Sequence, residues 1–139
     1  MSERKQNKKI DKRAPVIVGV GDLVDRSKED GLNPQELLAK ACEHAIQDSG
    51  IKELNKHIDY VGVVRFTVDF LTATNQSNFQ YSNFPRTLAN KLNISAKNEV
   101  YAPMGGNSPQ VLLEDALVKI STGETDCALL SGGEALQTM

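Results

Sequence analysis

The sequence predicts an α/β protein built on a mainly parallel, layered sheet, with its elements in the order β-α-β-α-β-α-β. Apolar runs of strand length alternate with longer segments whose apolar residues recur at helical spacing. Each helical segment begins at a residue that can cap a helix, with a proline one or two positions later. This alternation favours right-handed crossovers between parallel strands, and 139 residues suffice to bury one sizeable core.

The first predicted strand is the apolar run at residues 16–20, which is followed by a polar, glycine-containing loop up to residue 33. The first helix is predicted to begin at Asn33, because Asn33 can cap it, proline follows, and Glu36 can complete a capping box. Gly50 is suited to end it in the left-handed conformation. The expected buried stripe of this helix consists of Leu38, Ala41, Cys42 and Ala45.

The second strand is predicted within residues 58–66. The polar stretch 67–82 is long for a connection in a compact domain and therefore predicts a binding or interface loop. A shorter helix is expected from Asn83 to Asn93. Its inner face would carry Leu88, Ala89 and Leu92.

The third strand is predicted at residues 99–102 and the fourth at residues 126–131. Between them, Ser108 is expected to cap a helix that Gly123 closes. The apolar stripe expected for this helix comprises Leu113, Ala116, Leu117 and Ile120. A parallel sheet of four strands leaves an edge that needs cover. A shortened chain, a natural fragment and a dimer that covers the edge all remain open.

Charge is distributed unevenly along the chain. Residues 1–13 carry six Lys or Arg and two Asp or Glu, whereas the net charge of the whole chain is −2. We expect residues 1–13 to be a disordered basic tail and residues 14–139 to be the folded domain. The basic tail could contact nucleic acid, but the acidic body argues against a nucleic-acid partner.

The sequence contains neither a secretory leader pattern nor an apolar run of about 18 residues, so no membrane contact is expected. Cys42 and Cys127 are predicted to be buried free thiols, as in a reducing, cytoplasmic compartment. His44 and His57 lie in no metal-ligand spacing. We therefore predict that they have structural or solvent-exposed roles and that no metal is bound.

The stretch Gly105-Gly106-Asn107-Ser108-Pro109-Gln110 joins a predicted strand to a predicted helix. At such an elbow, glycines allow close approach to a ligand and the new helix presents unpaired N–H groups that bind anions. A tight β–α turn with a good N-cap would select the same residue types, so a purely structural role is the alternative. The stretch is not a Walker loop, and Gly19-x-Gly21 lacks the rest of a dinucleotide fingerprint.

Four segments, in order and at matching spacing, resemble the N-terminal part of the thiolase superfamily, of the acetyl-CoA acetyltransferase type. They are the opening strand at residues 15–21, the helix and turn at residues 33–51, the strand start Ile58-Asp59-Tyr60-Val61, and Gly123 to Glu134 with its glycine pair. The resemblance makes residues 14–139 a partial thiolase-like N-terminal domain.

The resemblance implies a five-layered α-β-α-β-α sandwich of two similar halves that dimerises through its N-terminal half. It also implies that an acyl-CoA thioester acylates a cysteine at the elbow after the third strand, for acyl transfer in lipid metabolism. Histidines and a second cysteine from the second half would complete the site. No covalently bound cofactor is implied, and the CoA thioester would be the substrate.

The position of the family's nucleophilic cysteine falls on Gly106 or Asn107, neither of which can form a thioester. Ser108 is the nearby hydroxyl, but a serine without a positioned base is a poor nucleophile. We therefore expect part of a thiolase-like acyl-CoA acyltransferase that is not catalytically competent alone, working as a homodimer or with a second half. The alternative is a non-enzymatic module for acyl-CoA binding or for assembly.

Overall fold

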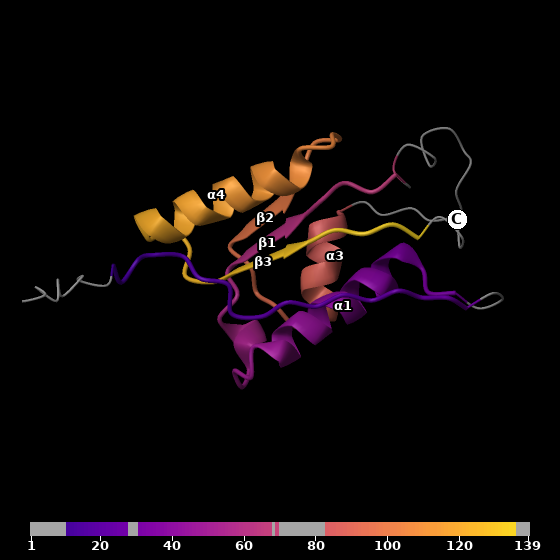
Figure 1. Cartoon of the computed structure of the whole chain (residues 1–139), viewed down its shortest axis with the longest axis horizontal. Coiled ribbons are helices and arrows are strands. Elements are labelled where there is room, and N and C mark those ends of the chain that lie inside the picture. The colour runs from indigo at the N-terminus through magenta and orange to yellow at the C-terminus, as the bar shows by residue number, and fades with distance from the viewer. Residues whose placement is uncertain (1–10, 28–30, 68, 70–82, 136–139) are drawn as a thin grey trace, which may run out of the picture.

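The computed structural model of the protein describes residues 11–27, 31–67, 69 and 83–135 (Figure 1). Its helices and strands alternate along the chain, with one turn of 3-10 helix at Leu54–Lys56. The elements are α1 (Pro34–Asp48), β1 (Tyr60–Val63), α3 (Phe84–Lys91), β2 (Asn98–Tyr101), α4 (Ser108–Thr122) and β3 (Ala128–Ser131).

The three strands form one parallel sheet in the order β2-β1-β3. Tyr60 at the start of β1 is level with Asn98 of β2 and with Ala128 of β3. The central strand β1 is buried along its whole length. The predicted class, a mainly parallel α/β fold, is therefore confirmed.

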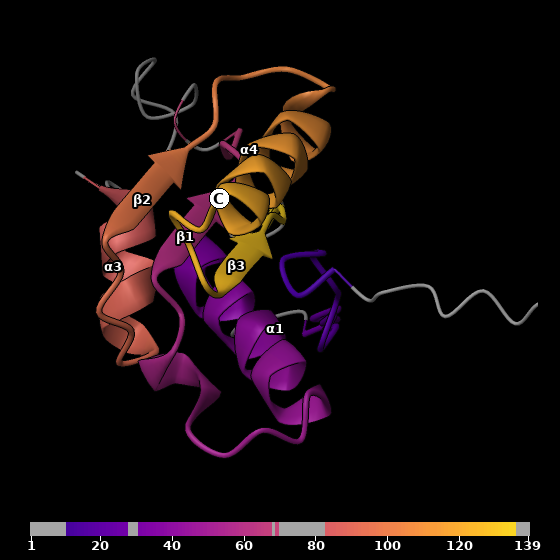
Figure 2. The same cartoon turned by 90° about the vertical axis from the view of Figure 1, so that its left-hand side faces the viewer.

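Helices cover both faces of the sheet (Figure 2). On one face, α1 and α3 enclose the main apolar core together with the alternate residues Val61 and Val63 of β1. On the other face lies α4, where Leu112 packs near Gly62. The hydroxyl of Tyr60 donates a hydrogen bond of 2.8 Å to Asp115 Oδ2 and fastens α4 to the central strand.

The predicted capping box at the start of α1 is confirmed. Asn33 Oδ1 accepts hydrogen bonds from the N–H groups of Gln35 and Glu36 at 3.0 and 2.9 Å. The Glu36 carboxylate accepts one from the N–H of Asn33 at 3.2 Å. At the other end, Gly50 has a φ of +65°, the conformation expected of a left-handed terminator.

Replacing Asn33 with alanine should lower the free energy of unfolding by about 1 kcal/mol, because two N–H groups of the first turn lose their acceptor. Urea denaturation followed by circular dichroism measures the change. Lys40→Ala on the exposed side of α1 is the matched control and should change stability by less than about 0.5 kcal/mol. Equal effects of the two substitutions would contradict a stabilising role of the cap.

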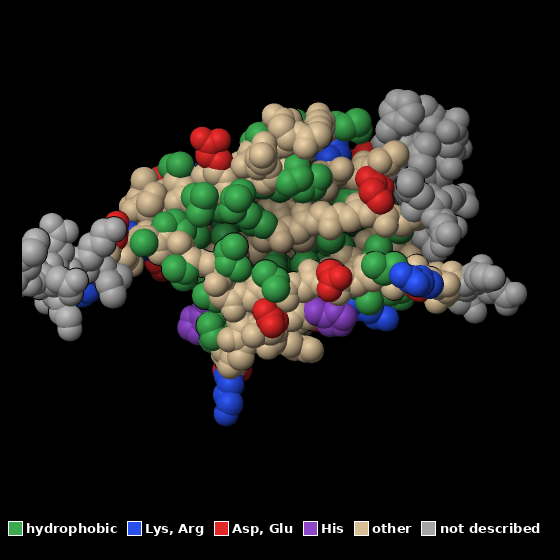
Figure 3. All heavy atoms as spheres, viewed as in Figure 1, with side chains coloured by type: hydrophobic (Ala, Val, Ile, Leu, Met, Phe, Trp, Pro, Cys, Tyr) green, Lys and Arg blue, Asp and Glu red, His purple; other side chains and the backbone are tan. Residues whose placement is uncertain are grey.

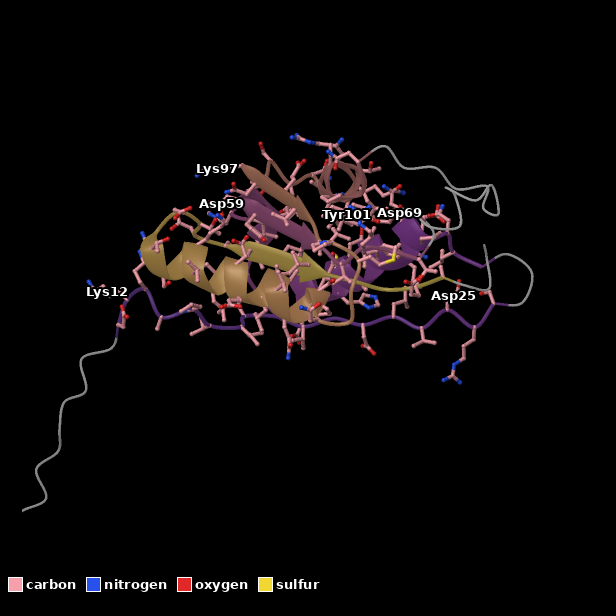
Figure 4. The ribbon with its side chains drawn as sticks, turned by 90° about the horizontal axis from the view of Figure 1, so that it is seen from above. Lys12, Asp25, Asp59, Asp69, Lys97 and Tyr101 are labelled. Carbon is pink, nitrogen blue, oxygen red and sulfur yellow. The ribbon has the colours of Figure 1, made fainter. Side chains whose placement is uncertain are left out.

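Asp59 ties together the amino-terminal ends of the three strands. Its Oδ1 accepts hydrogen bonds from the N–H groups of Asp126 and Cys127 at 3.2 and 3.3 Å, just before β3. Its Oδ2 lies 3.4 Å from the Lys97 ammonium, next to β2 (Figure 4). Its carbonyl accepts from the N–H groups of Lys97 and Asn98. The Ile58-Asp59 pair of the sequence motif thus has a structural role in aligning the sheet.

The predicted strand at residues 16–20 is not formed. This segment is extended and lies beside β3, but no backbone hydrogen bond joins it to β3. Val16 and Ile17 are 76% and 82% exposed. An apolar run predicts a strand from local composition, whereas pairing also requires the backbone to approach a free edge, and here the next residues pack on α1 instead.

The apolar stripe predicted for α4 is wrong in two of its four positions. Leu112 and Ala116 are buried against the sheet, whereas Leu113 and Leu117 are more than 40% exposed. The helix docks through the side that faces β1 and β3. This turns Leu113 and Leu117 toward the edge of β3 that pairs with no other strand among the described residues.

The remaining predictions on elements stand as follows. Helix α3 begins where expected, with Asn83 Oδ1 accepting from the N–H of Arg86 at 3.1 Å. Asn93 follows α3 with a φ of +53°. Residues 1–10 of the predicted tail, and nearly all of the long loop predicted at 67–82, lie outside the described residues. Among the helices described, none is long and apolar enough to cross a membrane.

Candidate functional site

The predicted elbow connects β2 to α4 at the carboxyl end of the sheet (Figure 1). Ala102 donates its N–H to the carbonyl of Val63, so the chain stays in the sheet until β1 has also ended. The turn follows, and α4 starts at Ser108. The predicted strand-to-helix geometry of residues 105–110 is therefore confirmed.

Gly106 lies at the open side of this elbow. A Cβ atom built on it would meet no atom within 4 Å, and its φ is not in the left-handed region. At Gly105, by contrast, a Cβ would lie 3.0 Å from Asn107 Oδ1. Position 106 can therefore accept a side chain that projects from the elbow into open space.

Ser108 has a structural role. The residue is 1% exposed, and its Oγ donates a hydrogen bond of 2.5 Å to the carbonyl of Pro103. The cap residue of α4 is Asn107, one position earlier than predicted, and its side chain makes no capping bond. Ser108 is therefore the first helical residue, and its hydroxyl closes the turn.

Replacing Ser108 with alanine should lower the free energy of unfolding by about 1 kcal/mol, because the hydrogen bond from the buried Ser108 hydroxyl to the carbonyl of Pro103 is lost. Thermal denaturation measures this loss. The same substitution should leave any CoA-thioester binding by the chain unchanged, since the hydroxyl faces the turn. Loss of binding with unchanged stability would contradict this assignment.

Neither histidine lies at the elbow. His44 is on α1, and its Nδ1 is 2.9 Å from the carbonyl oxygen of Asp22. His57 is exposed in the turn before β1, at the opposite end of the sheet. The described residues contain no group of three or more His, Cys, Asp or Glu that could hold a metal ion. Thus no imidazole from this part of the chain is positioned to activate Ser108.

The two cysteines are also remote from the elbow. Cys42 is buried on α1, and burial raises the pKa of its thiol to about 11, although a hydrogen bond with Ser131 acts in the opposite direction. Cys127 precedes β3 at the far end of the sheet and is half-buried, less than predicted. Burial raises the pKa of Cys127 as well. Both thiols are poor nucleophiles at neutral pH.

A cluster that the sequence analysis missed lies next to the elbow. Arg65 follows β1 and stacks its guanidinium 4.4 Å above the ring of Tyr101, at the end of β2. Its Nε donates to the carbonyl of Ala102 at 3.2 Å, and its Nη1 pairs with Asp69 Oδ2 at 3.0 Å. Figure 4 shows Tyr101 and Asp69 side by side. The sequence signal that could have predicted this cluster is a cationic residue and an aromatic residue at the ends of two strands that become neighbours.

This cluster holds the start of the elbow in place and does not supply acid–base chemistry at neutral pH. Burial is the main cause that raises the pKa of Tyr101 to about 12, so its hydroxyl stays protonated. Its oxygen accepts a hydrogen bond of 3.2 Å from the N–H of Phe66.

The glycine pair Gly132-Gly133, which follows β3, leads to a contact that joins the end of β3 to the residues after β1. Glu134 Oε1 accepts hydrogen bonds from the N–H and the Oγ1 of Thr67, at 2.9 and 2.7 Å. A Cβ on Gly132 would lie 2.9 Å from Val64 Cβ, so this close approach depends on glycine. The turn therefore supports the same carboxyl end of the sheet that carries the elbow.

No protein-family model matches the chain, and no curated protein matches it. Among solved structures, the chain is similar to a monomeric SCP2-thiolase like protein type 1 from Mycobacterium smegmatis, with 31% sequence identity and a TM-score of 0.73. The match covers 90% of this chain and 24% of that one, so this chain spans about a quarter of the length of the protein it matches.

The sheet, its helices and this match define the class: the chain has the thiolase-like α/β fold. More particularly, the chain corresponds to the N-terminal part of that fold.

Proposed function

We propose that this chain forms the acyl-CoA-binding N-terminal part of a thiolase-like acyltransferase, and that by itself it binds the thioester without becoming acylated. The observation that carries the proposal is the elbow, where Gly106 stands in open space and is one of the two residues, with Asn107, on which the position of the family's nucleophile is expected to fall. The nearest hydroxyl, on Ser108, is already bonded to the carbonyl of Pro103.

The elbow offers groups suited to a thioester carbonyl. The N–H groups of Gly106 and Asn107 have no backbone acceptor among the described residues. They precede a helix of 15 residues, whose dipole places partial positive charge at this end. Such donors polarise a carbonyl oxygen, and the space at position 106 leaves room for the acyl group.

The test incubates the full chain with acetyl-CoA, with acetoacetyl-CoA and with CoA alone, and reads out intact mass and thermal stability. The expected result is a rise of the melting temperature that depends on thioester concentration, with no covalent acetyl adduct. An acetyl adduct mapped to residues 102–110 would overturn the proposal that the chain by itself is not acylated. No response to any CoA compound would overturn the binding role.

A second candidate function is assembly through α4. Val111 and Val118 form an apolar stripe on the side of α4 away from β3, and they are 44% and 52% exposed. Exposed apolar stripes of this kind mark interaction surfaces. If a second copy covers the stripe, sedimentation should show a dimer that Val118→Glu dissociates. A monomer at all concentrations would contradict this candidate.

A further inference from the structure

The chain leaves the sheet for the elbow through the peptide bond between Ala102 and Pro103. Proline has no N–H, so the carbonyl of Ala102 is the one group of this peptide bond that can form a backbone hydrogen bond. Ala102 is fully buried, and its carbonyl accepts the hydrogen bond of 3.2 Å from Arg65 Nε. The orientation of this peptide plane therefore depends on Arg65.

The rest of the elbow is closed by Ser108. Its Oγ donates to the carbonyl of Pro103, and its N–H donates to the carbonyl of Gly105 at 3.0 Å. These bonds lie within the turn and do not join it to the sheet. Among the described residues, the turn is joined to the sheet by two hydrogen bonds, both at Ala102: its N–H bonds to Val63 and its carbonyl to the guanidinium.

Apolar packing holds α4 on the sheet without fixing this orientation. Apolar side chains gather over α4 and β3 on the face shown in Figure 3, and Leu112 and Ala116 of α4 are buried against the sheet. Hydrophobic association is non-directional, because it depends on the area removed from water. A hydrogen bond weakens steeply when donor and acceptor are misaligned. The direction of the elbow thus depends on the hydrogen bonds at its entry.

The guanidinium of Arg65 is itself held in place by its neighbours. It stacks on the ring of Tyr101, and its Nη1 pairs with Asp69 Oδ2. The ring of Tyr101 in turn stacks on Phe84, with their centroids 5.9 Å apart. A guanidinium can make these contacts together because its donors lie in one rigid plane, whereas the ammonium of a lysine is a point charge without such a plane.

We propose that Arg65 is the positioning residue of the elbow: by fixing the carbonyl of Ala102, it fixes the direction of the N–H groups of Gly106 and Asn107. It acts through the backbone and does not contact the thioester. The inference rests on the proposed function for what those N–H groups bind, whereas the order of the elbow can be measured without any ligand.

Hydrogen–deuterium exchange of the Arg65→Lys variant tests the proposal without a ligand. Lysine keeps the positive charge but loses the planar fork. The amides of Ala102 and Ser108 should exchange about tenfold faster than in the unmodified chain, because the entry of the turn opens locally. Amides in the middle of β1 should exchange at unchanged rates, which separates a local effect from a loss of global stability.

Arg86→Gln is the matched control for this experiment. Arg86 Nε lies 2.8 Å from Glu99 Oε1 on β2, so the variant removes an arginine that contacts this strand but leaves the entry of the elbow intact. It should change the exchange rates of Ala102 and Ser108 by less than about twofold. Equal effects of Arg65→Lys and Arg86→Gln, or no effect of Arg65→Lys, would overturn the proposal.

A thiol at position 106 gives a second readout, which a loss of stability in the folded protein would not move. In a Gly106→Cys background, the pH dependence of alkylation by iodoacetamide reports the pKa of the new thiol. Arg65→Lys should raise that pKa and lower the rate at pH 7 about three- to tenfold, although the positive charge is retained. An unchanged pH profile would overturn the proposal. If the thiol at position 106 is no more reactive than an exposed cysteine, the exchange rates decide.

Titration with acetyl-CoA separates this inference from the proposed function. If the unmodified chain binds, Arg65→Lys should bind about tenfold more weakly. No binding by the unmodified chain would overturn the proposed function, and the exchange rates would still decide the role of Arg65. If Arg65→Lys does not fold, Asp69→Ala is measured in its place, because it keeps the arginine but frees its Nη1. Faster exchange at Ala102 and Ser108 than in Arg86→Gln would support the proposal, and equal exchange would overturn it.

Discussion

Replacement of Asp59 with alanine is expected to lower the free energy of unfolding by about 2 to 3 kcal/mol. The carboxylate is largely buried and accepts hydrogen bonds from the N–H groups of Asp126 and Cys127, which lose their acceptor in the variant. The Lys97 ammonium also loses its partner. Urea denaturation measures this loss. An unchanged m-value would show that the substitution changes stability and not the surface exposed on unfolding.

Asp126→Ala is the control for this experiment. It removes an ion pair with Arg13 in which both side chains are at least half exposed, so the loss should stay below about 0.5 kcal/mol. Asp59→Asn keeps one acceptor oxygen, so its loss of unfolding free energy should lie between those of Asp59→Ala and Asp126→Ala. If Asp59→Ala costs no more than Asp126→Ala, Asp59 does not align the strands as the hydrogen bonds indicate.

Replacement of Gly106 with cysteine is expected to create the one reactive thiol of the chain. A Cβ atom at this position meets no atom within 4 Å, and the amino end of α4 is expected to lower the pKa of a thiol placed there. The native thiols of Cys42 and Cys127 have raised pKa values. At pH 7, alkylation by iodoacetamide should be about three- to tenfold faster at position 106 than at an ordinary exposed cysteine, and far faster than at the native ones.

Mass mapping of the alkylated peptides gives the rates, with Lys52→Cys, exposed in the turn after α1 and before the first α-helix that follows it, as the reference. The same variant, incubated with acetyl-CoA, would report whether the elbow can form the acyl adduct that the unmodified chain should lack. A rate at position 106 no greater than that of Lys52→Cys would show that the elbow does not activate a thiol.

Local signals were enough to predict the helices and the elbow. The Asn33 capping box, the terminator Gly50 and the glycines before α4 act within a few residues, so the sequence alone specifies them. The position of the elbow is predicted in the same way, because the end of the strand and the start of the helix each have their own local signal. The match to a thiolase-like structure agrees with the family resemblance that the sequence motifs indicated.

Features that depend on the docking of distant segments were not predictable in this way. Whether residues 16–20 pair with β3 depends on the approach of two backbones, which apolar composition does not encode. The inward face of α4 depends on how that helix settles on β1 and β3, so Leu112 is buried in place of Leu113. The stacking of Arg65 on Tyr101 requires that two strand ends be neighbours.

The position of β1 at the centre of the sheet has a consequence for biosynthesis. One of its neighbours, β2, is the next strand along the chain, whereas the other, β3, comes last of the three. During synthesis on the ribosome, one edge of β1 therefore lacks its pairing strand until Ala128–Ser131 has emerged. A nascent chain paused before this point would present an apolar strand edge to chaperones and to other nascent chains.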